Sequence, residues 1–161
     1  MEVKGYKCFH NGLTNSYGRN FSIGQIYISS KILKFGNNGH GFHFCKNIED
    51  TFRFFDTENK DVCVCEVTGS GKIIECNDEY NGYYNMYCAE KLKIERLLTR
   101  EEVIHIGLNL NDIRVKRFIS TFSLTEEEIQ LFKEKYSNNI DILNAIAYYQ
   151  ENDKDVYFRR M

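Results

Sequence analysis

The pattern of apolar residues changes at Leu98, and this change limits the architecture of the chain more than any other feature. Before it, short apolar runs are separated by clusters of Gly and Asn, a texture typical of strands and turns. After it, apolar residues recur at helical spacing. The sequence therefore predicts an α+β protein: a β-rich unit over residues 1–98, and a helical extension over residues 99–161 that packs on it within one structural domain.

Six segments in the first part are predicted strands. They are rich in aromatic and β-branched side chains and cover residues 3–9, 25–29, 41–45, 61–68, 72–76 and 85–97. The Gly-Ser-Gly-Lys run at 69–72 predicts a hairpin turn between the fourth and the fifth. One helix is expected to cross the sheet. It begins after Asn47, a predicted N-cap, because Glu49 and Asp50 follow in its first turn.

Two capping boxes predict where helices begin after Leu98. Thr99 is followed three residues later by Glu102, and Thr125 is followed by Glu128, each next to an apolar residue. Apolar stripes predict two further helices over residues 111–121 and 140–150.

Charge and composition exclude some classes of function. The chain has 21 Lys and Arg against 23 Asp and Glu, a formal net charge of −2. Such a chain has no overall field to attract nucleic acid or an anionic membrane surface. The first residues lack the basic and apolar regions of a secretory signal, and no run is apolar for long enough to span a bilayer. We therefore expect a cytoplasmic protein whose six cysteines are reduced.

A strand followed directly by a helix over residues 41–55 predicts a pocket for a small planar ligand. Alternation sends Phe42 and Phe44 to one face of the strand and His43 to the other. Thr51 and Phe54 lie about one turn apart in the helix and offer a hydroxyl group and a stacking ring. The alternative is that His43 is an ordinary packed or surface histidine.

Glu90 is the second candidate site residue. It shares a strand face with Met86, Cys88 and Leu92, so its carboxylate interrupts a row of apolar side chains. A buried carboxylate is costly unless it is paired or functional, and its pKa is expected to rise. The alternative is that Glu90 lies in water at the strand end or pairs with a lysine such as Lys72.

Five runs resemble an uncharacterised domain family found in phages and mobile elements. They are residues 4–9 (Lys-Gly-Tyr-Lys-Cys-Phe), 21–27 (Phe-Ser-Ile-Gly-Gln-Ile-Tyr), 41–47 (Gly-Phe-His-Phe-Cys-Lys-Asn), 64–67 (Val-Cys-Glu-Val) and 91–94 (Lys-Leu-Lys-Ile). The resemblance covers residues 2–104. It implies an origin in a phage or prophage and brings no known activity.

The Gly-Phe-His-Phe run at 41–44, followed by Thr51 and Phe54, is similar to the ADP-ribosyltransferases of the poly(ADP-ribose) polymerase type. This resemblance implies a related fold and NAD as cofactor. It places His43 and Phe54 on the nicotinamide ring and Thr51 on its amide. The catalytic glutamate of that family aligns with Met86, so the catalytic role falls to Glu90 on the same face. The family's histidine-glycine pair is replaced by Gly-Tyr-Lys at 5–7.

These features leave three functions open. The first is a protein-binding effector or inhibitor that acts on a host or competing protein and carries a nucleotide pocket, with exposed aromatics such as Tyr148 and Tyr149 at its interface. The second is an enzyme that cleaves NAD or transfers ADP-ribose. The third is a regulatory domain that binds metal through the pairs Cys8 and His10, His43 and Cys45, and Cys63 and Cys65.

Overall fold

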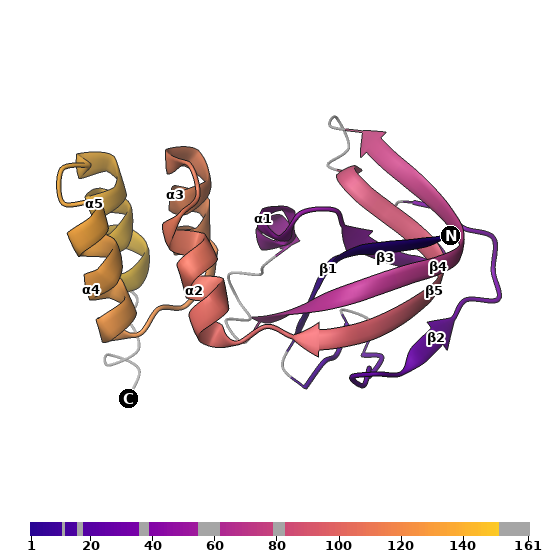
Figure 1. Ribbon diagram of the computed structural model, residues 1–161. Coiled ribbons are helices and arrows are strands. Elements are labelled where there is room, and N and C mark those ends of the chain that lie inside the picture. Colours follow the sequence, from indigo (N-terminus) through magenta and orange to yellow (C-terminus); the bar gives the residue numbers. More distant parts are fainter. Residues whose placement is uncertain (11, 16–17, 36–38, 55–61, 79–82, 152–161) are drawn as a thin grey trace. The chain divides into compact units, whose positions relative to one another are not determined.

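The computed structural model describes residues 1–10, 12–15, 18–35, 39–54, 62–78 and 83–151. Within them the protein has an antiparallel sheet of five strands and five α-helices, four of which follow the sheet in the chain (Figure 1). This arrangement confirms the predicted α+β class. The chain forms two compact units, which divide at Leu98 and Thr99. That the helical unit packs on the sheet remains a prediction.

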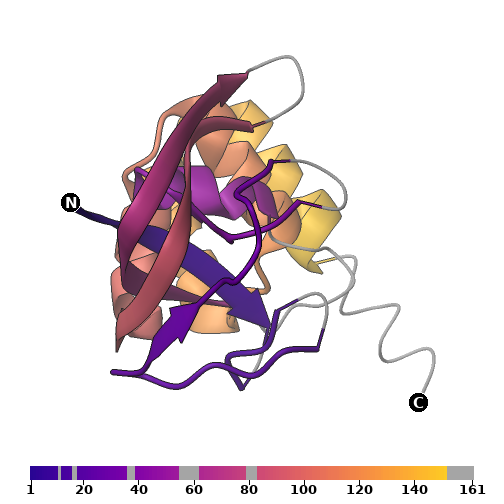
Figure 2. The ribbon, with the colours of Figure 1, turned by 90° about the vertical axis from the view of Figure 1, so that its right-hand side faces the viewer.

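The sheet closes on itself. Its strands are β1 (Glu2–His10), β2 (Ile26–Ile28), β3 (Phe42–Cys45), β4 (Val62–Asp78) and β5 (Tyr83–Leu97). They pair in the order β2-β5-β3-β1-β4, and β4 also pairs with β5, so that β1, β3, β5 and β4 complete a ring. Figures 1 and 2 show β4 and β5 side by side as the two long strands of the ring.

The predicted hairpin turn at 69–72 is wrong, because β4 runs through it as one strand. Gly69 and Ser70 pair with β5, and the ladder resumes at Ile73 after a register shift. Gly71 has a φ of 74°, which glycine adopts without strain. Gly71 and Lys72 therefore lie opposite the single residue Glu90, so that β4 accommodates one extra residue as a bulge. The pairing that keeps the strand continuous comes from β5, which local turn chemistry does not reveal.

The core of the β-rich unit is built around the ring of Phe44, which is 1% exposed. A Cβ atom at Gly5 would lie 2.6 Å from Phe44 Cδ2, and one at Gly69 would lie 2.6 Å from Phe44 Cζ. Two glycines on neighbouring strands therefore make room for one large ring. The other buried members of this core are Phe9, Phe21, Phe42, Cys65, Val67, Ala89, Leu92 and Ile94.

The helix after β3 begins where the sequence predicts and is short. α1 (Ile48–Thr51) continues into a 3₁₀ turn, η1 (Phe52–Phe54). Asn47 is the N-cap residue, but its side chain does not cap the backbone. Its Nδ2 instead donates to Asp50 Oδ2 at 3.2 Å.

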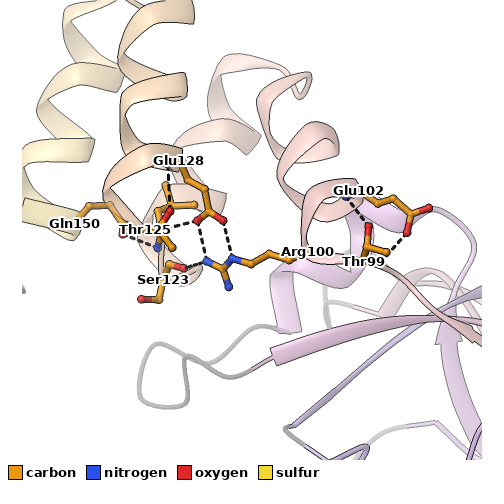
Figure 3. A network of polar contacts seen from close by, with 8 residues as sticks. Thr99, Arg100, Glu102, Ser123, Thr125, Glu128 and Gln150 are labelled. Carbon is orange, nitrogen blue, oxygen red and sulfur yellow. Dashed lines mark hydrogen bonds and ion pairs between the residues drawn. The ribbon is translucent and has the colours of Figure 1, made fainter.

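The helical unit contains α2 (Arg100–Leu108), α3 (Asp112–Thr121), α4 (Glu126–Lys135) and α5 (Ile140–Ile146), and α5 continues as a π-helical turn, η2 (Ala147–Glu151). Both predicted capping boxes are confirmed (Figure 3). The Thr99 hydroxyl accepts from the Glu102 N–H at 3.1 Å, and the Thr125 hydroxyl accepts from the Glu128 N–H at 3.2 Å. In both, the glutamate also accepts from the threonine N–H.

Gln150 is a buried polar residue that joins α3 to α4 (Figure 3). Its Oε1 accepts from the backbone N–H of Leu124 at 3.0 Å. Its Nε2 donates to the carbonyl oxygens of Ile119 and Phe122 at 2.5 and 2.8 Å. These groups lie at the C-terminal end of α3 and in the link to α4, where carbonyls lack partners within the helix. One side chain therefore satisfies three backbone groups.

Candidate functional site

A cavity of about 450 Å³ lies in the β-rich unit between β1 and β3. Among the described residues these strands share one partner pair, Tyr6 with Cys45. The lining combines aromatic rings with thiols and basic side chains, and its charged or polar members include Lys7, His10, Arg19 and His43. None of the described lining residues is Asp or Glu. The cavity therefore has the size and basic character of a site for a small anion.

Lys7 reaches from β1 to β3. Its Nζ donates to the carbonyl oxygen of His43 at 2.6 Å and lies 5.8 Å from the centroid of the Phe9 ring. The side chain lines the cavity, and burial lowers the pKa of its ammonium group. Lys7 is thus a hydrogen-bond donor held in the opening between the two strands.

His43 lines the same cavity as Lys7. As predicted from alternation, Phe42 and Phe44 are buried in the core, whereas His43 is half-buried, with its ring 4.9 Å from that of Phe35. Its Nε2 is buried and has no hydrogen-bond partner in the part of the chain that the structure describes. Burial, together with the nearby Lys7 ammonium, lowers the pKa of His43 to about 4. His43 is therefore neutral at pH 7 and carries a buried ring nitrogen without a hydrogen-bond partner among the described residues.

This lowered pKa makes stability depend on pH. The unfolded chain takes up a proton on His43 near pH 6.5, whereas the folded protein does so only near pH 4. The free energy of unfolding is therefore highest above pH 6.5 and decreases as the pH falls from 6.5 to 4. After allowance for partial exposure we expect a loss of about 2 kcal/mol. Urea unfolding of wild type and His43→Gln at pH 7 and pH 4.5 measures it. Equal pH dependence in the two proteins would contradict this assignment.

Arg19 and Phe54 are exposed residues of the cavity lining. The Arg19 guanidinium lies 5.2 to 5.4 Å from the ring centroids of Phe21, Tyr27 and Phe42. Its backbone N–H donates to Asn15 Oδ1 at 2.9 Å. The Phe54 ring is 43% exposed. A positive charge held against rings at a cavity can pair with a phosphate or carboxylate while a planar group stacks on aromatic faces.

The four site residues predicted from the sequence do not all line the same cavity. His43 and Phe54 line one cavity. Thr51 is fully buried, outside the described lining, and its hydroxyl donates to the Ile48 carbonyl at 2.6 Å. Glu90 also lies outside that lining; its Oε2 accepts from the backbone N–H of Lys72 at 3.0 Å, across the bulge of β4. Met86, at the position aligned with the catalytic glutamate, does line the cavity.

The cysteines are free thiols. Cys45, Cys65 and Cys88 are buried, and Cys8, Cys63 and Cys76 are half-buried. Burial raises the pKa of Cys8 to about 11 and that of Cys45 to about 12, so both cavity thiols are protonated at pH 7. In the described ranges no group of three or more His, Cys, Asp or Glu side chains could hold a metal ion.

Lys7 and Arg19 are the site residues that the sequence reasoning missed. A sequence pattern could have identified Lys7. Alternation along the strand places it on the same face as Gly5 and Phe9, which is the face directed toward the core. No such pattern marks Arg19, since it lies between strands and reaches its rings only through the fold.

The geometry defines a small α+β domain with a closed antiparallel sheet and a ligand-sized basic cavity. Residues 3–106 match the model of a family described as Domain of unknown function (DUF7666). The chain belongs to this family, and the match confirms the predicted membership of an uncharacterised domain family over nearly the predicted range. No curated protein and no solved structure matches the chain. Within the described residues, no helix combines the length and apolar character that crossing a membrane requires.

Proposed function

We propose that the β-rich unit is a binding module for a planar, negatively charged small molecule of the nucleotide class. The observation that carries this proposal is the cavity between β1 and β3, where aromatic rings surround Lys7 and Arg19 and no described lining residue is acidic. Rings stack on a planar base, and a guanidinium pairs with phosphate oxygens in two parallel hydrogen bonds. Lys7 and His43 would then meet the polar edge of the base.

The wider role that we propose is that of a cytoplasmic phage- or prophage-type effector that binds a host or competing protein. An origin in a phage or prophage is supported by the five sequence runs that resemble a domain family found in phages and mobile elements. A protein interface is supported by Tyr148 and Tyr149, which are 67% and 40% exposed, with ring centroids 4.8 Å apart. Exposed tyrosines are enriched at protein interfaces. We expect the wild-type protein to capture a partner from a host lysate and a Tyr148→Ser, Tyr149→Ser double variant to lose this capture.

An enzyme that cleaves NAD or transfers ADP-ribose is the second candidate. It is favoured by one observation: His43 and Phe54, the two residues expected to hold nicotinamide, line a single cavity. It requires a carboxylate near the reacting centre, because the positive charge that develops as nicotinamide leaves must be stabilised. Glu90 contacts Lys72 instead. Nicotinamide release that is lost in Glu90→Gln would establish the enzyme; we expect no release from either protein.

Calorimetric titration with AMP and adenosine tests the binding module. We expect AMP to bind more tightly than adenosine. We also expect Arg19→Gln to weaken AMP binding about tenfold, because one charge pair worth about 1.4 kcal/mol is lost. The affinity for adenosine, which has no phosphate, should be nearly unchanged. The matched control is Arg96→Gln, because Arg96 pairs with Glu66 and lies outside the described lining. Absence of binding by both compounds would refute the proposal.

A further inference from the structure

Lys7 combines a hydrogen bond of its amine with a place in the cavity lining. On one side its Nζ donates to the His43 carbonyl oxygen at 2.6 Å. On the other, the residue forms part of the wall of a cavity of about 450 Å³. A lysine whose only task was to satisfy that carbonyl would not need to face a cavity of this size.

The surroundings of Lys7 raise the fraction of its amine that is neutral. The described lining residues include no carboxylate that would stabilise an ammonium group, and the neighbouring side chains are rings and protonated thiols. Burial lowers the pKa of the amine accordingly. A neutral amine can donate one N–H to the His43 oxygen and still direct its lone pair into the cavity. Only that neutral form attacks a carbonyl carbon.

We propose that Lys7 is a reactive amine that forms an imine with an aldehyde or ketone carried by a planar anionic molecule in the cavity. The amine nitrogen attacks the carbonyl carbon, and the carbon–oxygen π electrons move to oxygen. Protons pass from nitrogen to that oxygen, which leaves as water while the carbon–nitrogen double bond forms. No electron donor or acceptor is needed. The inference rests on the proposed function only for the planar, anionic character of the ligand.

Pyridoxal 5′-phosphate is the probe, because it combines a planar ring, a phosphate and an aldehyde. Wild-type protein is incubated with it at pH 7.5, the imine is reduced with borohydride, and the modified lysines are mapped by mass spectrometry. We expect Lys7 to be labelled at least ten times as much as Lys4, an exposed lysine of the same strand. Labelling of Lys7 that is no greater than that of Lys4 would overturn the proposal.

A second measurement separates this inference from the proposed function. AMP is added before the probe, and its binding is measured in the same protein. If AMP binds and Lys7 stays unlabelled, the imine proposal alone fails. If Lys7 is labelled selectively but AMP neither binds nor protects it, the nucleotide assignment fails and the reactive amine stands. Lys7→Arg should abolish selective labelling, whereas Lys4→Arg, at an exposed position of the same strand, should leave both the labelling of Lys7 and AMP binding unchanged.

Discussion

Replacing Gln150 with leucine should lower the free energy of unfolding of the helical unit by about 4 kcal/mol, since each buried polar group left without a partner costs about 1–3 kcal/mol. The substitution keeps most of the side-chain volume and removes three hydrogen bonds. It leaves the Leu124 N–H and the carbonyls of Ile119 and Phe122 without their partner at the end of α3. Hydrogen exchange of the α3 and α4 amides measures the loss in that unit.

The matched control is Gln130→Leu in α4. Gln130 is exposed and makes one side-chain hydrogen bond, to Glu134 at 3.4 Å. A surface substitution of this kind should change stability by less than about 0.5 kcal/mol. Similar exchange rates in the two variants would show that Gln150 does not hold the link between α3 and α4.

Replacing Gly5 with alanine should destabilise the β-rich unit by about 3 kcal/mol, the upper range for forcing a methyl group into a packed core. The added Cβ would lie 2.4 Å from the carbonyl oxygen of Cys45 and 2.6 Å from the Phe44 ring. The carbonyl belongs to the backbone and cannot rotate away. Relief would therefore require β1 and β3 to separate at the pair of Tyr6 and Cys45, which also borders the cavity.

Urea unfolding of Gly5→Ala compared with Lys4→Ala measures this effect. Lys4 precedes Gly5 in β1 and is exposed, so its truncation removes no core contact. A Gly5→Ala protein as stable as the Lys4→Ala protein would mean that the two strands are not in close contact at this point.

Local signals in the sequence predicted the helices well, because caps are made by residues three positions apart. Thr99 with Glu102 and Thr125 with Glu128 form both predicted boxes. The same local reasoning failed at 69–72, where glycines typical of a turn form a bulge within β4. The difference is that β5 supplies the hydrogen bonds there, and a partner strand cannot be read from four residues.

The candidate site was predicted only in part, for a similar reason. Alternation within one short strand placed Phe44 in the core and His43 away from it. Helical spacing paired Thr51 with Phe54, yet α1 ends at Thr51 and a 3₁₀ turn carries Phe54 to the cavity. Strand periodicity put Glu90 in a row with Met86, but the bulge opposite Glu90 offers the Lys72 N–H to its carboxylate.

A nuclear magnetic resonance titration with AMP tests most directly whether the cavity between β1 and β3 is a ligand site. We expect the backbone amide signals of Lys7, Cys8 and His43 to shift together and saturably, while those of Thr51 and Glu90 change little. Signals of Lys7, Cys8 and His43 that stay in place at saturating AMP, or shifts centred on Glu90, would contradict it.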